Sequence, residues 1–302
     1  MSPSSLPSAS PADLTTARSR WPAVSCHHVE VDGLRLFYRQ AGDPLLPTLV
    51  LLHGFPSSSH MFRDLMPLLA ARFHVVAPDY VGFGHSAAPD VHQFAYTFAR
   101  QAELMQALLD RLGLQRYMLY MQDYGGPIGM RLATAQPQRV TGLVFQNANL
   151  YMEGVSEAAQ AVFMPLWQHG DETGARQMLL PETTRYQYLA GARRPDALNP
   201  DAWVMDQALL DRPGSAERQL ALFRDYQHNV ALYERWQAYL RAHQPRTLVA
   251  WGEGDPFFTV AGAQAFARDL KEVAIHLLPS GHFALEEEAA TVAALISSHF
   301  PA

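Results

Sequence analysis

One carboxylate stands at a predicted turn where it could act as a nucleophile. Asp123 follows an apolar run, residues 116–121, and precedes Gly125 and Gly126, after which residues 127–135 have a helical pattern. This pattern predicts a strand, a tight turn carrying Asp123, and a helix. The two glycines permit the close approach of helix to strand that such a turn requires. A carboxylate is ionised near neutral pH, so Asp123 can attack carbon without first giving a proton to a base.

Two further segments carry residues that could serve such a nucleophile. Asp255 follows the strand expected at residues 247–251, and His282 follows the strand expected at residues 274–278. Because open α/β sheets build their sites at the carboxyl ends of parallel strands, we expect both residues to lie near Asp123. The alternative for Asp255 is a cap for the helix after Pro256. Asn147 also follows a strand, but its amide carries no charge, and we interpret it as a turn residue or a water ligand.

The elements that must position these residues alternate along the chain. Residues 26–31 and 34–40 predict a hairpin around Asp32-Gly33. Strands are expected at 48–52, 75–78, 117–121, 142–146, 247–251 and 274–278, and helices at 59–71, 94–112, 127–135, 260–270 and from about 285. This alternation predicts the α/β class, with a mostly parallel central sheet flanked by helices.

The domain organisation follows from one long interruption of this alternation. Residues 150–243 contain helix-compatible runs and no good strand, which predicts a helical cap inserted into the sheet domain. The core domain would then comprise residues 23–149 and 244–302. Residues 1–22, rich in Ser, Pro and Ala, are expected to form a mobile tail without a signal-peptide pattern.

Composition excludes several classes of function. The 302 residues include 23 basic and 29 acidic side chains, a net charge of −6 that gives no reason to bind nucleic acid. Cys26 is the single cysteine, so neither an internal disulfide nor a cysteine-based zinc site is expected, and a cytoplasmic location fits. No apolar run approaches the ~20 residues of a membrane-spanning helix, so no membrane association is predicted.

With these motifs in view, the sequence resembles the α/β-hydrolase superfamily. The resemblance extends from about Val29 to the C-terminus and is densest in HGFPSSSHMFR, DYVGFGHS, QDYGGPIG, WGEGDPFF and GHF. It is most similar to the epoxide hydrolase and haloalkane dehalogenase group, which uses an aspartate nucleophile. The resemblance implies an α/β-hydrolase fold, the order nucleophile, acid and histidine, and the following roles: nucleophile Asp123, general base His282, its acidic partner Asp255, and an oxyanion hole made by the N–H groups of Phe55 and Tyr124.

The leaving group distinguishes the two activities of this group. The resemblance implies that a departing halide would be held by N–H donors such as a tryptophan after the nucleophile, where this chain has Tyr124. A cap tryptophan could still supply a donor, and Trp167, Trp203 and Trp236 are the candidates. We therefore expect an epoxide hydrolase, with haloalkane or haloacid dehalogenation as the alternative.

Epoxide opening would require an acidic hydroxyl in the cap. The segment DYQHN resembles the cap motif that carries such a tyrosine, which makes Tyr226 the candidate, with Tyr188 or Tyr186 as a second. The same tyrosines and Trp167 could instead only pack the cap against the sheet. We expect Tyr226, Tyr188 and Trp167 to contact the substrate.

No cofactor or metal is expected, because the histidines show no reliable metal-ligand spacing. The expected partner is a small apolar substrate, and the chain is expected to act as a monomer or homodimer. A binding protein that has lost its chemistry is the alternative from another class, and the intact set of Asp123, Asp255 and His282 argues against it.

Overall fold

A single sheet organises the molecule. The computed structural model describes residues 24–301, and the tail predicted at residues 1–22 lies outside them. The strand order is β1-β2-β4-β3-β5-β6-β7-β8. The strands are β1 (Ser25–Val31), β2 (Leu34–Ala41), β3 (Thr48–Leu52), β4 (His74–Pro78), β5 (Tyr117–Gln122), β6 (Val140–Gln146), β7 (Thr247–Gly252) and β8 (Val273–Leu278). β2 pairs antiparallel with β1 and β4, and the other neighbours pair parallel, which confirms the predicted sheet.

The predicted hairpin at the sheet edge is also confirmed. Val31 pairs with Leu34, so Asp32 and Gly33 form a two-residue turn. Both have positive φ, 49° and 74°. Two consecutive residues with positive φ match the right-handed twist of the flanking strands, and Asp-Gly is a favoured pair for such turns.

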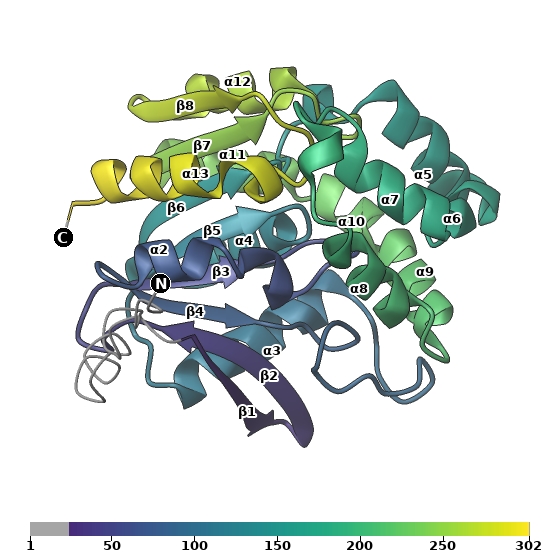
Figure 1. Ribbon diagram of the computed structural model, residues 1–302, viewed down its shortest axis with the longest axis horizontal. Helices are drawn as coiled ribbons and strands as arrows, with labels where there is room; N and C mark the ends of the chain where they lie inside the picture. Colours follow the sequence, from purple (N-terminus) through teal and green to yellow (C-terminus); the bar gives the residue numbers. More distant parts are fainter. Residues whose placement is uncertain (1–23, 302) are drawn as a thin grey trace, which may run out of the picture.

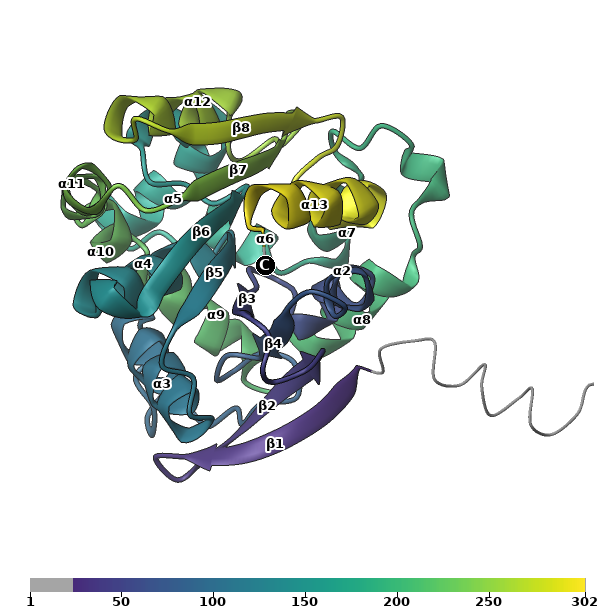
Figure 2. The same ribbon diagram turned by 90° about the vertical axis from the view of Figure 1, so that its left-hand side faces the viewer.

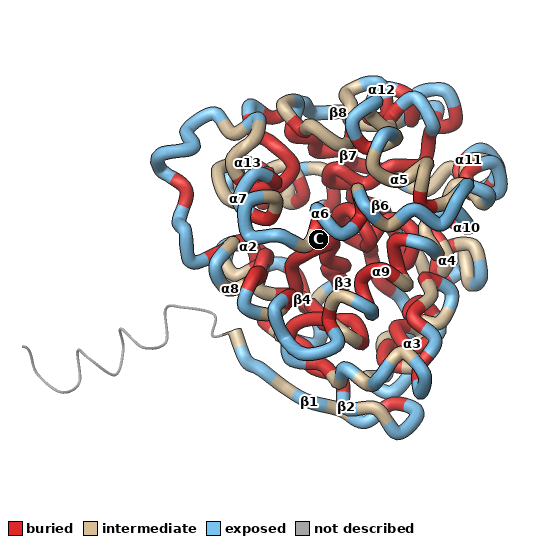
Figure 3. Tube along the Cα trace, turned by 90° about the vertical axis from the view of Figure 1, so that its right-hand side faces the viewer, coloured by how far each residue is buried: buried red, intermediate tan, exposed pale blue. Residues whose placement is uncertain are grey.

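Both faces of the sheet are buried, and the side chains of β3 alternate between them. Leu49 and Leu51 join one apolar cluster, whereas Val50 and Leu52 join the other. Figure 3 shows buried positions concentrated along the central strands and exposed ones along the outer helices and β1. Burial on two faces explains why these strands read as continuous apolar runs.

Helices cover the two faces of the sheet (Figure 2). On one face lie α3 (Phe98–Arg111), α4 (Gly125–Ala135) and α12 (Val260–Asp269), and on the other lie α2 (Leu65–Leu69) and α13 (Leu285–His299). Apolar residues of α3, α4 and α12 belong to the cluster of Val50, and those of α2 and α13 to the cluster of Leu49. The sheet is thus the middle layer of three.

Two predicted helices differ from the observed ones. The helix expected at 59–71 is a 3-10 turn, η1 (Ser59–Phe62), followed by the short α2. Pro67 explains the break, because its ring has no N–H and would clash with the preceding turn of a continuous helix. The helix expected at 94–112 begins only at Phe98, since Thr97 is extended and its side chain accepts a hydrogen bond from the Arg100 N–H, 3.1 Å.

The segment between β6 and β7 is helical. It contains α5 (Glu157–His169), α6 (Thr173–Gln177), α7 (Pro181–Leu189), α8 (Asp201–Leu210), α9 (Ser215–Asp225), α10 (Gln227–Val230) and α11 (Tyr233–His243). Helices α5 to α10 lie beyond the ends to which the arrows of the parallel strands β3 to β8 point (Figure 1). Helix α11 instead packs against α4 and α12. In residues 24–301 no helix is both long and apolar enough to cross a membrane.

Candidate active site

Asp123 occupies the tight turn between β5 and α4. Its φ is 46°, in the left-handed region. A Cβ at Gly125 would come within 2.2 Å of the Leu52 carbonyl oxygen, so only glycine lets α4 approach β3 this closely. A Cβ at Gly54 would collide with Asp123 itself. The predicted turn and the requirement for glycine at 125 are confirmed, and they fix the carboxylate at the carboxyl edge of the sheet.

Two backbone donors hold the Asp123 carboxylate. The Phe55 N–H, in the loop after β3, donates to Asp123 Oδ1 at 2.6 Å. The Tyr124 N–H, at the start of α4, donates to the same carboxylate. The two residues expected to form an oxyanion hole are therefore brought together around Asp123. Converging N–H groups of this kind stabilise negative charge on oxygen.

Asp255 and His282 form a buried pair beside this carboxylate. His282 Nδ1 donates to Asp255 Oδ2 at 2.7 Å. Asp255 Oδ1 accepts from the N–H groups of Phe257 and Phe258, at 2.8 and 3.1 Å. Asp255 does not cap α12, which begins at Val260 after Thr259. The loop after β7 thus holds a carboxylate that orients the imidazole and fixes which of its nitrogens faces Asp255.

Asn147 supports this pair from the neighbouring strand. It follows β6 with φ 45°, and its amide nitrogen donates to Asp255 Oδ2 at 2.8 Å and to the Gly252 carbonyl at 3.2 Å. The backbone carbonyl oxygen of Asn147 accepts a hydrogen bond from the Asp123 N–H at 3.1 Å. Asn147 is a turn residue, as interpreted, but it also ties the loops of Asp123 and Asp255 together. Its pairing with Asp255 depends on the adjacency of β6 and β7, which no local pattern encodes.

Gln122 contacts the other side of the imidazole. Its amide nitrogen lies 3.0 Å from His282 Nε2. With Nδ1–H given to Asp255, Nε2 of the neutral ring is an acceptor. Gln122 was not singled out by sequence, although its place directly before Asp123 on β5 is a signal that could have identified it.

Burial and neighbouring charges have opposite effects on the pKa values of Asp123 and His282. Burial raises the pKa of Asp123, while the His282 charge and the N–H groups of Phe55 and Tyr124 lower it, with a net increase above the usual range. Burial lowers the pKa of His282, but Asp255, and more weakly Asp123, outweigh it and raise the pKa above its usual value. The site therefore stabilises the imidazolium while Asp123 is anionic.

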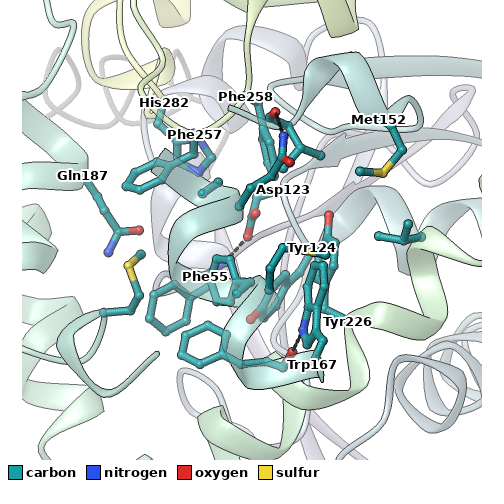
Figure 4. A pocket seen from close by; sticks show the side chains of 18 residues that line it. Phe55, Asp123, Tyr124, Met152, Trp167, Gln187, Tyr226, Phe257, Phe258 and His282 are labelled. Atoms are coloured by element: carbon teal, nitrogen blue, oxygen red, sulfur yellow. Dashed lines mark hydrogen bonds between the residues drawn. The ribbon is translucent and has the colours of Figure 1, made fainter. Parts of the chain in front are cut away.

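A cavity of about 70 Å³ lies over Asp123 and is walled mainly by apolar side chains. Figure 4 shows Asp123 at its centre, His282 and Phe257 on one side and Tyr124, Tyr226 and Trp167 on another. Cap helices contribute the aliphatic, sulfur and aromatic part of the wall: Ala159, Phe163, Met164, Met178, Phe223 and Val230. An enclosed apolar cavity with a few polar groups is typical of a site for a small molecule.

Comparison with known proteins identifies the family of this site. The model of the alpha/beta hydrolase fold family matches residues 47–289. The chain belongs to the α/β-hydrolase superfamily. It is 40% identical to "Uncharacterized hydrolase YNR064C" of Saccharomyces cerevisiae, over 91% of this chain and 96% of that protein. It is 28% identical to a haloalkane dehalogenase of Mesorhizobium japonicum, over 84% of each chain.

Solved structures of α/β-hydrolases agree with this assignment. Haloalkane dehalogenase DbeA from Bradyrhizobium elkani superimposes with a TM-score of 0.77 and 29% identity, covering 92% of this chain and 99% of its own. Epoxide hydrolase CorEH has a TM-score of 0.76 at 20% identity over 92% and 99% of the two chains, a likeness of fold alone. The predicted superfamily, its dehalogenase and epoxide hydrolase group, its fold and an enzyme are confirmed.

The structure separates the three predicted cap residues of this α/β-hydrolase. Tyr226 and Trp167 line the cavity and stack, with ring centroids 6.1 Å apart. Tyr188 does not line it, because its hydroxyl donates to Asp206 Oδ2 at 2.5 Å and its ring stacks on Phe283. Its expected role in substrate contact therefore has no geometric support.

The remaining aromatic candidates also lie away from the cavity wall. Tyr186 is 53% exposed. Trp203 packs near Tyr188, and Trp236 packs under the Arg131 guanidinium of α4, 5.4 Å from the ring. Among residues 24–301, no cluster of three or more His, Cys, Asp or Glu side chains could hold a metal ion.

Proposed function

We propose that this enzyme opens epoxides through a covalent ester on Asp123 that water then hydrolyses. One observation supports epoxides over halides. The Tyr226 hydroxyl is buried in the cavity wall beside the Tyr233 hydroxyl and near Asp123, whereas the Trp167 N–H donates to the Phe223 carbonyl at 2.8 Å. A tyrosine O–H can protonate an epoxide oxygen, and an N–H already given to a carbonyl is not available to hold a departing halide.

In the first step the free oxygen of Asp123 attacks a ring carbon. Oδ1 is held by the Phe55 N–H, which leaves Oδ2 to form the new C–O bond. The ring C–O bond breaks, and its electron pair takes the proton of the Tyr226 hydroxyl. The products of this step are a hydroxyalkyl ester and a tyrosinate.

In the second step water attacks the carbonyl carbon of the ester. His282 Nε2 takes a proton from this water, and the oxyanion forms at Oδ1 against the N–H groups of Phe55 and Tyr124. General-base assistance contributes typically ~10²–10⁴-fold. Collapse of the intermediate expels the diol oxygen, which takes the proton back from His282 and leaves Asp123 as a carboxylic acid. Asp123 then loses its proton to solvent, which restores the carboxylate, and solvent returns a proton to the Tyr226 tyrosinate.

Ester formation itself prepares His282 for this step. The anionic charge of Asp123 is one of the causes that raise the pKa of His282. Esterification removes that charge, so the pKa falls and the neutral imidazole, the form that accepts a proton, becomes more populated. The base is therefore favoured at the stage that needs it.

Trapping the ester tests this proposal. His282→Gln should become alkylated by a small apolar epoxide, with an intact-mass increase equal to the mass of the epoxide, because Asp123 still attacks but water is no longer activated. The double variant with Asp123→Asn is the matched control and should gain no mass. A protein that stays unmodified across a panel of epoxides contradicts the proposal and favours a binding protein.

Dehalogenation is the second candidate, because haloalkane dehalogenases are prominent among the relatives. The same Asp123 ester and the same hydrolysis would serve it, with halide as leaving group. Chloride or bromide release from haloalkanes by the wild-type enzyme, without diol formation from epoxides, would decide for it. The panel therefore pairs epoxides with haloalkanes and fluoroacetate.

A further inference from the structure

One cap residue has no role in this proposed chemistry although it lies in the cavity wall. Gln187 of α7 is 2% exposed and lines the cavity. Within residues 24–301 its amide nitrogen, Nε2, is buried and has no hydrogen-bond partner. Buried polar groups in native proteins are almost always paired, so this exception requires an explanation.

Helix α7 is anchored on both sides of Gln187. The Thr184 hydroxyl donates to Gln207 at 2.6 Å and the Tyr188 hydroxyl donates to Asp206 at 2.5 Å, both on α8. The Tyr188 ring also stacks on Phe283, next to His282, with centroids 3.9 Å apart. Gln187 is thus held in place by its neighbours, and its unpaired amide is not explained by a loose helix.

A second glutamine of the cavity wall, Gln160, has a hydrogen-bonded side chain. The Gln160 amide nitrogen donates to the Val155 carbonyl at 2.9 Å, so its polar group is satisfied within the cap. Gln187 is therefore the glutamine of this wall whose N–H donors remain available to a ligand.

The position of Gln187 indicates which part of a ligand it would meet. In Figure 4 Gln187 and Tyr226 lie on opposite sides of Asp123. An epoxide whose oxygen is near Tyr226 and whose carbon is near Asp123 must extend its substituent toward the other side. Gln187 is in the cavity wall on that side.

We infer that Gln187 determines specificity, by donating a hydrogen bond to an oxygen acceptor in the substituent of the substrate. The substrate class is then an epoxide with an ether or carbonyl oxygen beyond the ring, in an otherwise apolar molecule. This inference rests on the proposed epoxide opening. A site with a buried donor rejects an analogue that lacks the acceptor, because the donor is left unpaired after water is excluded.

The test uses two epoxides of equal length, an alkyl glycidyl ether and the 1,2-epoxyalkane with a methylene in place of the ether oxygen. The wild-type kcat/KM should be about tenfold higher for the ether, the effect of one hydrogen bond to a neutral group. Gln187→Leu should lose this preference by a lower kcat/KM for the ether, with the epoxyalkane changed less than about twofold. Gln160→Leu, the matched control, should keep the preference.

The outcomes that contradict the inference are distinct from failure of the proposed function. Equal wild-type kcat/KM for the two epoxides, or an equal loss for both in Gln187→Leu, would overturn the role of Gln187 and leave epoxide opening intact. Absence of turnover of either epoxide by the wild-type enzyme would overturn both. The wild-type comparison needs no variant, so it decides even if Gln187→Leu folds poorly.

Discussion

The two sides of the cavity differ in how completely their polar groups are paired. On the sheet side, Asp123 Oδ1, both oxygens of Asp255 and both ring nitrogens of His282 have partners, and within residues 24–301 the Tyr124 hydroxyl is the group of the wall without one. On the cap side, the Gln187 amide nitrogen has none among the described residues, and the Tyr226 hydroxyl has the Tyr233 hydroxyl beside it. Asp123, Asp255 and His282 are thus held by hydrogen bonds within the protein, whereas the Gln187 amide is a donor that a ligand could satisfy.

This difference divides the work between the two regions. The loops after the parallel strands β5, β7 and β8 hold Asp123, Asp255 and His282, and close packing fixes their relative positions. In the proposed function, the hydroxyl of Tyr226 and the amide of Gln187 select substrates by their leaving group and their substituent. Changes on the sheet side should therefore alter rates for every substrate, and changes on the cap side should alter rates for some.

The largest effect is expected from Asp255→Ala. His282 would lose both its orienting partner and the charge that stabilises its imidazolium, and kcat should fall by roughly 10³–10⁴-fold for all substrates. Alkylation of Asp123 should continue, so rapid-quench mass spectrometry should find accumulated ester. An unchanged fraction of ester during turnover would contradict a role for Asp255 in hydrolysis.

A smaller and selective effect is expected from Tyr226→Phe. Loss of the hydroxyl removes the acid for the epoxide oxygen and should slow ester formation by roughly 10²-fold. Stopped-flow measurement of the alkylation step isolates this effect. Tyr233→Phe, whose hydroxyl is beside that of Tyr226 but outside the cavity wall, should have a weaker effect, because it leaves the Tyr226 hydroxyl in place. An equal loss for epoxides and haloalkanes would mean that Tyr226 only packs the cap.

The Asp123→Asn variant should keep its structure and lower the pKa of His282. The amide mimics the uncharged ester, so one cause that raises the pKa of His282 disappears. The imidazole should titrate at lower pH than in the wild-type protein, which should titrate above the usual 6.5, and NMR of the ring resonances can follow both. A higher value in the variant would contradict the coupling.

The smallest effect on the site is expected from Asp206→Asn, on α8. Burial raises the pKa of Asp206 to about 7, although the Tyr188 and Ser57 hydroxyls favour its anion; nearby Glu286 raises it and Arg63 lowers it. The pKa of Asp206 is higher in the folded protein than in the unfolded chain. The contribution of Asp206 to the free energy of unfolding is therefore fully present below about pH 4 and is lost as pH rises to about 7. The asparagine side chain does not ionise, so the variant should not lose this stability. Relative to the wild-type protein, its free energy of unfolding should be higher at pH 8 than at pH 4 by roughly 2–4 kcal/mol.

Urea unfolding of both proteins at the two pH values measures this gain. Turnover at pH 8 should be unchanged, since Asp206 lies outside the cavity wall. A variant less stable than the wild-type protein at pH 8 would contradict the burial of a carboxyl group that resists ionisation.

The sheet and its catalytic turns were predictable because their signals are local. Buried strands read as apolar runs, and Asp123, Asp255 and His282 each follow such a run directly. Helix starts at Leu65 and Phe98 were missed, because a proline and a capping threonine override the apolar pattern. The sequence indicates a turn residue or a water ligand at Asn147, but its contact with Asp255 in the loop after β7 depends on strand order, which no local pattern encodes.

The cap was less predictable for a physical reason. A helical pattern specifies which residues share a face but not which neighbour that face meets. Gln187 and Tyr188 are consecutive on α7 and point in different directions. Sequence spacing does not reveal that Gln187 faces the cavity and that Tyr188 pairs with Asp206. The predicted monomer or homodimer and the cytoplasmic location stay predictions.

The central claim is that Asp123 is alkylated and then released by hydrolysis at its own carboxyl carbon. One turnover of an epoxide in ¹⁸O-water, with enzyme in excess, tests it most directly. Mass spectrometry of the peptide containing Asp123 should find one ¹⁸O in that side chain, and the diol from this first cycle should carry none. Label in the diol with an unlabelled Asp123 would contradict the account, because water would then have attacked the substrate directly.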